Sequence, residues 1–388
     1  MSSGYQTTPA DERPSIGIGM LGYGFMGRAH TNAFRTMPYI FWPGGCRRHL
    51  VAICGRTETA LREAATRYGF ANYARDWHTL VEDERVDVFD NVGADDAHVE
   101  PTLAAIKVGK HVVCEKPLAL NAHDAEQLVR AAESARVKHL TCFNYRFVPA
   151  VRLAHDLVHG RELGNIYQAR FRYSQEWRTD PATELPLPAG ALKAIGCHAV
   201  DQSRFLVGEI AAVSARFTSP VTTPERRFRG HPVEQDDTVA ILAEFEGGAV
   251  GTIDASLVSP GRKNMLAWEI NGSKGSVAWN LEQLNYLHVY RGSGTRTQGF
   301  TEVIVCEADH TLASPWWPSG HILGWEHGHI NMLAHFLDAV VNDGRVEPYG
   351  ATFHDGAQAA RVGEAAVESA HAGHRVAVES LRTATDGD

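Results

Sequence analysis

A lysine with the potential for catalysis follows a short apolar run in the first third of the chain. Residues 111–117 read HVVCEKP, so Lys116 stands where a buried strand would end, and Pro117 stiffens the chain that follows. If this strand belongs to a parallel sheet, its carboxyl end faces the ligand crevice. An ammonium group there can donate a hydrogen bond to a substrate oxygen and stabilise the alkoxide that forms as a hydride leaves. The alternative is an ordinary surface lysine ahead of a helix.

A glycine-rich turn near the amino terminus predicts a dinucleotide site. It lies between the apolar run 15–21 and the beginning of a helical pattern, which is the context that the G-x-G-x-x-G fingerprint requires. The first glycine permits a tight turn, the second lets the backbone approach a pyrophosphate, and the third lets the helix pack close to the strand with its N-terminus facing the phosphates. The residues predicted to bind the cofactor here are Gly22, Tyr23, Gly24, Phe25, Met26 and Gly27.

The residues after the second predicted strand bear on the choice of cofactor. NAD-selective folds usually end this strand with an acidic residue that binds the ribose hydroxyls. Here the strand ends at Gly55, and Arg56 and Thr57 follow. An arginine and a hydroxyl can hold a 2′-phosphate, so the sequence favours NADP(H), while NAD(H) stays open because Arg56 can equally be a solvated residue at a helix start. Three further predicted cofactor contacts are His98, after the third strand, and Glu115 and Lys116, at the end of the fourth strand.

Two different patterns of strands and helices divide the chain. From residue 15 to 146, apolar strands alternate with helical runs of about a dozen residues, which predicts parallel strands with right-handed crossovers. From residue 165 onward, period-two strands follow one another without long helices, and helical segments end the chain. We predict a mobile leader (1–14), an α/β Rossmann domain (15–146) and an α+β domain with a mostly antiparallel, open-faced sheet (147–388), whose last helices pack back on the junction.

Composition and charge limit the class of partner. The net charge of −9 provides no basic field for a phosphate backbone, so a small molecule is favoured over a nucleic acid. No apolar run approaches the roughly 20 residues that cross a bilayer, and the first residues contain no apolar signal core, so a cytoplasmic protein without a membrane partner is predicted. The 6 cysteines are scattered without a C-x-x-C pair, which favours buried reduced thiols over disulfides or zinc.

Several segments together resemble the glucose-fructose oxidoreductase, inositol dehydrogenase and rhizopine catabolism (Gfo/Idh/MocA) family. They are GYGFMGRAH, the strand end CEKP, NYRF with the following Pro149, GCHAVDQSRFLVG and the late segment ATFHDGAQAARVGEAAVESAHAG. The resemblance covers nearly the whole chain, and EKP with the late helix is specific to the family. It implies a Rossmann domain, a second domain whose open sheet serves homo-oligomerisation as a dimer or tetramer, and oxidation or reduction of a sugar, aminosugar or cyclitol with NAD(P).

The resemblance also implies catalytic roles, with one departure. Lys116 falls on the family lysine and His198 on the family histidine, the usual proton acceptor in alcohol oxidation. Many relatives place an aspartate four residues before that histidine, where this chain has Ala194. Without a carboxylate there, the pKa of His198 should be lower than in such relatives. Lys193 is either a second ammonium group in the site or a solvated residue, and Asp201 either orients the His198 ring or lies on the helix surface.

Further side chains are predicted to contact the substrate. Tyr145, Arg146 and Trp177 lie at expected strand ends that open toward the crevice, although core packing explains Trp177 equally well. The stretch 37–45, MPYIFWPGG, resembles one in levoglucosan-dehydrogenase-like members of the family and is expected to cap the site.

A pair of histidines near the start of a late helix is a further candidate. His327 and His329 sit where family members often place a polar group on the substrate side. Because residues two apart do not share a helix face, the pair is a poor metal site, and no metal is predicted.

The leading prediction is an oxidoreductase that moves a hydride between nicotinamide and a carbinol or keto carbon, with Lys116 polarising the oxygen and His198 moving the proton. One alternative is a redox-neutral NAD-dependent glycosidase or epimerase, in which the cofactor is reduced and reoxidised within one turnover. The other is a non-catalytic dinucleotide-binding regulator, which the missing aspartate at position 194 favours.

Overall fold

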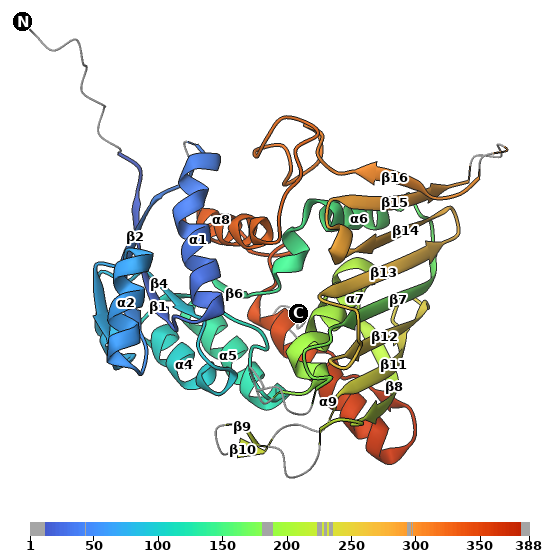
Figure 1. Cartoon of the computed structure of the whole chain (residues 1–388), viewed down its shortest axis with the longest axis horizontal. Helices are drawn as coiled ribbons and strands as arrows, with labels where there is room; N and C mark the ends of the chain where they lie inside the picture. The colour runs from blue at the N-terminus through green and yellow to red at the C-terminus, as the bar shows by residue number, and fades with distance from the viewer. Residues whose placement is uncertain are drawn as a thin grey trace, which may run out of the picture.

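The computed structural model describes residues 12–42, 44–180, 189–222, 227–228, 231–232, 236–292, 296 and 298–381. A first α/β layer structure occupies one side of the molecule, and a large curved sheet occupies the other (Figure 1). The strands of the first part are β1 (Ser15–Leu21), β2 (Arg47–Cys54), β3 (Asn72–Ala74), β4 (Val88–Asn91), β5 (His111–Cys114) and β6 (His139–Thr141). Its helices are α1 (Phe25–Ile40), α2 (Glu58–Tyr68), α3 (His78–Glu82), α4 (Val99–Lys107) and α5 (Ala122–Ala135).

The first sheet has the Rossmann arrangement that the alternating pattern predicts. All neighbouring strands are parallel, in the order β3-β2-β1-β4-β5-β6. The order reverses between β1 and β4, and the crevice outside the carboxyl ends at such a point is where these folds bind ligands. In the register of the sheet Leu21 pairs with Cys54 and with Asn91, and Asn91 pairs with Cys114, so these ends are level. The predicted fold of this domain is therefore confirmed.

Short helices of this domain form where apolar residues recur at helical spacing. In α2, Leu61, Ala64, Ala65 and Tyr68 are buried, which is one face of the helix. The helix stops at Gly69, whose φ of 82° is the left-handed conformation that glycine adopts without steric cost.

The second part of the chain builds a mixed sheet. Its strands are β7 (Ile166–Ser174), β8 (Ile210–Thr218), β11 (Thr238–Phe245), β12 (Val250–Ser256), β13 (Met265–Gly272), β14 (Gly275–Asn280), β15 (Tyr286–Arg291), β16 (Thr301–Ile304) and β17 (Val376–Ala377), with β9 (Arg227–Phe228) and β10 (His231–Pro232) pairing separately. Its helices are α6 (Pro149–His159), α7 (Cys197–Val207), α8 (Glu326–Val341) and α9 (Phe353–Ala372). The sheet order is β16-β15-β14-β13-β7-β12-β11-β8-β17, and β7 with β12 is its parallel pair.

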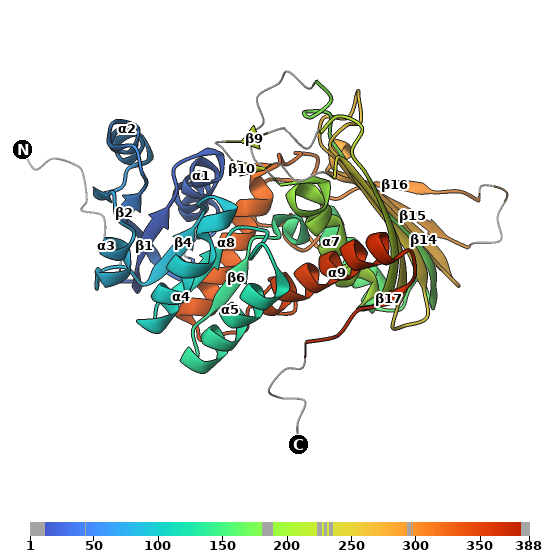
Figure 2. The same ribbon diagram turned by 90° about the horizontal axis from the view of Figure 1, so that it is seen from below.

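Helices cover one face of this sheet and leave the other face open (Figure 2). Burial alternates along the strands: in β11, Val239, Ile241 and Ala243 point into the core, while Ala240 and Leu242 are exposed. This is the period-two pattern of a sheet that is packed on one side. The predicted mostly antiparallel, open-faced sheet is confirmed.

The last two long helices cross back to the first domain. Helix α8 packs against α1, and α9 packs against both α5 and β8. At the start of α9, Thr352 and Asp355 form a capping box, which satisfies backbone amides at the helix start. The amide of Phe353 donates a hydrogen bond of 2.9 Å to Nδ1 of His139, in β6. Among the described residues, no helix is both long and apolar enough to cross a bilayer.

The structure bears on three local expectations, namely the strand 139–145, the leader 1–14 and, in the next paragraph, the stretch 37–45. The expected strand 139–145 stops at Thr141, because the chain turns into a 3-10 helix at Asn144–Phe147. Residues 1–11 of the predicted leader lie outside the described residues, whereas Arg13 and Pro14 are not loose, since their carbonyls accept hydrogen bonds from Arg47.

The stretch 37–45, expected to cap the site, lies away from the glycine turn. It begins in the last turn of α1, and a helix of 16 residues places its two ends about 24 Å apart. There Phe41 packs edge-on against Trp316, and Trp42 lies under the guanidinium of Arg13. Pro43 of this stretch lies outside the described residues.

The buried imidazole of His139 predicts an acid limit to stability. Burial lowers the pKa of His139 to about 4, so the folded chain holds the ring neutral while an unfolded chain protonates it near pH 6.5. The stabilisation is therefore complete above pH 6.5 and is lost as the pH falls toward about 4. We expect His139→Gln to weaken this pH dependence of the free energy of unfolding, measured by urea denaturation at several pH values. His371→Gln, on the exposed end of α9, is the control; equal pH profiles of the two variants would contradict the expectation.

Candidate active site

Lys116 lies at the carboxyl edge of the first sheet and reaches the second domain. It follows β5, and its Nζ donates a hydrogen bond of 3.0 Å to the carbonyl of Ala194, in the π-helical turn Leu192–Gly196 that leads into α7. Burial lowers the pKa of Lys116, but Cys197 and the carboxylate of Glu115 raise it, and the result is a pKa above the ordinary value. The side chain is thus held as an ammonium group at the edge where ligands bind.

His198 stands near the start of α7 and is only 7% exposed. Its ring lies edge-on to Tyr145, Phe143 and Tyr173, with ring centroids 4.8, 5.7 and 5.9 Å away. Burial and then the charge of Lys116 lower the pKa of His198 well below its usual value. The neutral ring can accept a proton, but an imidazolium here needs a negative charge close by.

The glycine turn has the geometry of a dinucleotide cradle. Gly22 has a φ of 109°, and a Cβ on it would lie 2.5 Å from the carbonyl oxygen of Val92. A Cβ on Gly27 would lie 2.7 Å from the carbonyl oxygen of Gly22, so α1 packs closely against the turn. At Gly24, the N-cap of α1, a Cβ would meet nothing within 4 Å, which leaves room for a phosphate in front of the helix N-terminus. These residues fit a bound dinucleotide.

The end of β2 explains why this chain has no acidic residue there. A Cβ on Gly55 would lie 2.1 Å from the ring of Tyr23, so the ring occupies the space that a side chain at position 55 needs. Arg56 and Thr57 follow on the surface, and Thr57 is the N-cap of α2 but makes no capping hydrogen bond with its side chain. A guanidinium and a hydroxyl are therefore displayed beside the crevice.

Two histidines in the same region keep buried ring nitrogens without a hydrogen-bond partner. His98 uses Nδ1 for the carbonyl of Pro117, at 2.7 Å, while its Nε2 has no partner. His329, on α8, is 1% exposed, and neither of its ring nitrogens has a partner. Because buried polar atoms are nearly always hydrogen-bonded in native proteins, these nitrogens suit polar groups of a cofactor or substrate.

Aromatic rings complete the walls of the site. Phe25, from the glycine turn, stacks on Trp325 with ring centroids 5.4 Å apart, and Trp325 lies edge-on to His329. The hydroxyl of Tyr145 lies 2.9 Å from that of Tyr173 and accepts a hydrogen bond from the indole of Trp325. The predicted neighbourhood of Tyr145 and His198 is thus present, and it is joined to the glycine turn through Trp325.

Arg146 and Asp201 serve the structure in a way that the sequence did not indicate. Nε and Nη2 of Arg146 donate to the carboxylate of Asp201, and Nη2 also bonds to Asp355 at 3.0 Å. Arg146 is 2% exposed and Asp201 1%. The expectations that Arg146 contacts the substrate and that Asp201 orients His198 are therefore wrong, because these two groups neutralise each other.

The remaining candidates separate into different environments. Trp177 is half-buried, packs against the core of the second domain and donates a hydrogen bond to Gln175. Lys193 is half-buried in the π-helical turn, beside Ala194. His327 packs against Trp316 and accepts a hydrogen bond from the amide of Gly324, so it turns away from His329.

Two buried residues of the site were missed at the sequence level. His30, on α1, bonds to Asp90, in β4, and to Glu115, beside the catalytic lysine candidate. One signal was available, since Asp90 is a charged residue within the apolar strand VFDN. His30 stands three residues after Gly27, on the face of α1 that turns toward the sheet.

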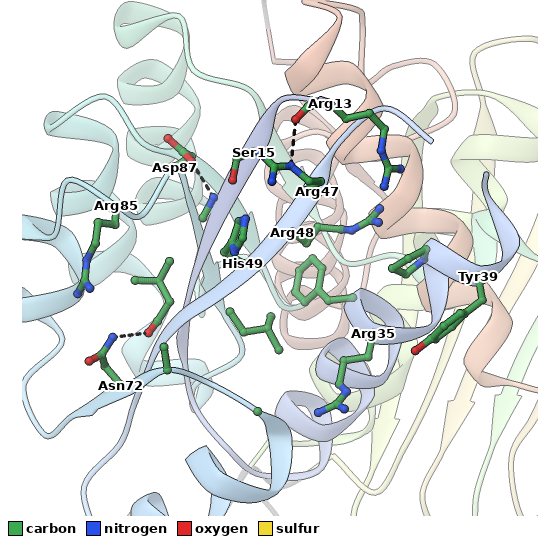
Figure 3. A pocket seen from close by; sticks show the side chains of 17 residues that line it. Arg13, Ser15, Arg35, Tyr39, Arg47, Arg48, His49, Asn72, Arg85 and Asp87 are labelled. Carbon is green, nitrogen blue, oxygen red and sulfur yellow. Dashed lines mark hydrogen bonds between the residues drawn. The ribbon is translucent and has the colours of Figure 1, made fainter. Parts of the chain in front are cut away.

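A large cavity of about 940 Å³ lies elsewhere, at the amino ends of β1 and β2 (Figure 3). Its walls carry Arg13, Arg35, Arg47, Arg48 and Arg85. This edge is opposite to the one that bears the glycine turn and Lys116, so we do not assign the cavity to the site.

The sequences of known families agree with this geometry. A family model described as "Oxidoreductase family, NAD-binding Rossmann fold" matches residues 16–143, and one described as "GFO/IDH/MocA C-terminal domain" matches residues 151–278. The chain belongs to the Gfo/Idh/MocA family. Within this family, levoglucosan dehydrogenase of Pseudarthrobacter phenanthrenivorans is 33% identical over 92% of this chain and 96% of its own length. Myo-inositol 2-dehydrogenase of Thermotoga maritima is 28% identical over 67% of this chain and 74% of its own length.

Solved structures of Gfo/Idh/MocA proteins superpose closely on the chain. Levoglucosan dehydrogenase in complex with NADH and L-sorbose has a TM-score of 0.90 at 33% identity, covering 95% of this chain and 100% of the other. An oxidoreductase domain protein from Kribbella flavida has a TM-score of 0.89 at 37% identity, with the same coverage. The predicted family and the NAD-binding oxidoreductase class are confirmed.

The buried ion pairs of Arg146 predict a variant whose defect is in stability. Arg146→Ala leaves the carboxylate of Asp201 buried without its cation, so we expect the free energy of unfolding to fall by about 3–5 kcal/mol. Arg130→Ala, which removes an exposed pair with Glu126 in α5, should cost less than about 1 kcal/mol. Denaturant unfolding of both variants is the measurement. Unchanged stability of Arg146→Ala, together with a raised KM for a substrate, would instead support the expectation that Arg146 contacts the substrate.

Proposed function

We propose that this protein oxidises a carbinol carbon of a sugar, aminosugar or cyclitol with NAD(P)⁺, or reduces the corresponding ketone. The observation that carries the proposal is the position of Lys116, whose ammonium group bonds to the carbonyl of Ala194 at the carboxyl edge of a dinucleotide-binding sheet. His198 and His329 lie at the same place with buried rings. A cation and neutral imidazoles beside a nicotinamide site are the groups that alcohol oxidation requires.

Lys116 would act on the substrate oxygen, and His198 would act on the hydroxyl proton. When bound, nicotinamide supplies the acceptor for the hydride that leaves the carbinol carbon. Lys116 donates a hydrogen bond to the substrate oxygen and stabilises its negative charge as the hydride leaves. His198 accepts the hydroxyl proton, so that the carbon becomes a carbonyl and the proton ends on the imidazole. Glu115 stands behind Lys116, and its charge favours the protonated form of His198.

A sugar-like substrate suits the walls of the site. The rings of Tyr145, Tyr173 and Trp325 present apolar faces with polar edges, which suits a ring bearing hydroxyl groups. The two free nitrogens of His329 can exchange hydrogen bonds with such hydroxyls. The relatives named above are a levoglucosan dehydrogenase and a myo-inositol dehydrogenase, which supports the same class of substrate.

We further propose that the open sheet face joins copies of the chain. Leu242 and Val250 lie on strands of this face and are 52% and 48% exposed. Apolar side chains that stand free on a wide sheet are often covered by a second subunit. The cytoplasmic location remains a prediction from the sequence.

Removal of the lysine should abolish hydride transfer without abolishing cofactor binding. We expect Lys116→Ala to lower kcat/KM for a responsive sugar by about a hundredfold or more, because a donor to the developing alkoxide is lost. The Kd of NADPH, followed by its fluorescence, should change little. Lys107→Ala, at the exposed end of α4, is the matched control. Full activity of Lys116→Ala would contradict the proposed function, and so would the absence of cofactor binding by the natural protein.

The surface arginine after β2 should select the phosphorylated cofactor. We propose that Arg56 and Thr57 bind the 2′-phosphate of NADP(H), since Tyr23 excludes an acidic side chain at position 55. Arg56→Ala should raise the KM for NADPH about tenfold, the loss of a charge-assisted hydrogen bond, and leave that for NADH unchanged. Arg62→Ala, on the exposed face of α2, is the control. Equal effects on both cofactors would favour NAD(H) as the natural partner.

A further inference from the structure

Charged residues of alternating sign follow one another behind the site: Asp90, His30, Glu115 and Lys116. Nδ1 of His30 lies 3.0 and 3.1 Å from the carboxylate oxygens of Asp90, and its Nε2 lies 3.2 Å from Oε1 of Glu115. Next along the chain is Lys116, whose backbone amide donates to the same carboxylate of Glu115. Asp90 and His30 are fully buried, and Glu115 is 4% exposed. The line of hydrogen bonds therefore runs from the middle of the first sheet to the backbone amide of Lys116, whose half-buried side chain bonds to Ala194 in the site.

The geometry at His30 suits a ring whose two nitrogens both carry a proton, since each faces a carboxylate oxygen, although burial raises the pKa of Asp90. A neutral imidazole has a single N–H and would turn a lone pair toward one of the two carboxylates. Burial lowers the pKa of His30, but the attraction and hydrogen bonds of Asp90 and Cys142 together outweigh it, and the pKa lies well above the usual value. The Sγ of Cys142 also lies close enough for a metal site with His30 and Glu115. An imidazolium has no lone pair for a metal, however, so the cluster fits a hydrogen-bonded line.

His30 acts on Glu115 as a fixed cation. Burial raises the pKa of Glu115, yet its hydrogen bond and attraction to His30, followed by Lys116, bring that pKa down to about 2. The other titratable groups that face this line include the half-buried Asp95, which acts on Lys116, and four groups that are uncharged near neutral pH, because burial raises the pKa of each thiol and lowers the pKa of each imidazole. They are Cys114 in β5, Cys142 after β6, His198 on α7 and His329 on α8. Glu115 is thus the anion that this line presents to the site.

We propose that Asp90 and His30 are positioning residues that keep Glu115 ionised, and that Glu115 is the counter-charge of Lys116 and His198 in a site where residue 194 carries no carboxylate. The inference rests on the proposed function. Accepting the substrate proton turns His198 into a cation next to the ammonium group of Lys116. Two neighbouring cations in a buried site repel each other, and the carboxylate of Glu115 offsets that repulsion.

Asp90→Asn tests the line because it removes the negative charge of residue 90 and leaves the shape of the side chain nearly unchanged. Without the carboxylate, His30 loses the second proton, and Glu115 then becomes protonated at a higher pH. We expect the acid limb of kcat/KM that reports the ionisation of Glu115 to move up by about one to three pH units, opposite to the downward shift that loss of this charge gives the pKa of His198, with little change in the Kd of NADPH. Asp87→Asn, just before β4, is the control, because its carboxylate bonds to the amide of Gly17 and not to this line. An unchanged acid limb in Asp90→Asn overturns the inference.

A rescue experiment separates charge from packing. Asp90→Asn/Ala194→Asp places a carboxylate at the position where many relatives have one, so it should return the acid limb toward that of the natural protein. If Asp90→Asn does not fold, Glu115→Gln removes the counter-charge directly, and Ala194→Asp should restore part of its lost kcat. Failure of Ala194→Asp to restore either variant would mean that the line supports the fold and not the charge balance.

A spectroscopic readout is independent of the reaction. In protein with ¹⁵N-labelled histidine rings, His30, assigned through His30→Gln, should give the two similar nitrogen shifts of an imidazolium at neutral pH. Asp90→Asn should give the widely separated shifts of a neutral ring. A neutral His30 in the natural protein overturns the inference even if sugars are oxidised. If no sugar is oxidised while His30 is an imidazolium, the proposed function fails and the structural part of the inference stands.

Discussion

The half-buried ammonium group of Lys116 needs nearby polar groups and anions to offset its charge, and this constraint shapes the junction between the two domains. Lys116 reaches from the first sheet to the carbonyl of Ala194, in the turn before α7. The turn brings His198 to the same point, so this hydrogen bond is one of the contacts that join the dinucleotide-binding sheet to the second domain. The remaining polar groups of the site are arranged around this bond.

Helices from distant parts of the chain stabilise that junction. Helix α8 packs on α1, and its first turn brings Trp325 against Phe25 of the glycine turn. Helix α9 begins beside His139 and holds Asp355 against Arg146. The two domains are therefore joined by apolar packing near the cofactor turn and by buried ion pairs behind it, and the crevice between them is built from both.

Local patterns were sufficient to predict the fold. Strand and helix periodicity, the glycine fingerprint and the segment CEKP depend on neighbours within a few residues, and the structure has the expected sheets. The position of Arg146 depends on Asp201, 55 residues away, so its ion pair had no local signal. The same holds for His30, which meets partners 60 and 85 residues along the chain.

The expected cap at 37–45 rested on a resemblance, whereas the position of this stretch follows from the length of α1, which carries it to the far edge of the sheet. Gly55 shows the opposite case, since the absence of an acidic residue was visible in the sequence and its physical reason, the ring of Tyr23, appeared with the structure.

Transfer of a deuterium label tests the central claim most directly. The protein is incubated with NAD(P)⁺ and sugars or cyclitols deuterated at their carbinol carbons, and the reduced nicotinamide is analysed by mass spectrometry. The nicotinamide should gain one deuterium from one of these substrates, and Lys116→Ala should transfer none. Consumption of substrate with no label accumulating in the nicotinamide would contradict net hydride transfer, and so would a label transfer that persists without Lys116.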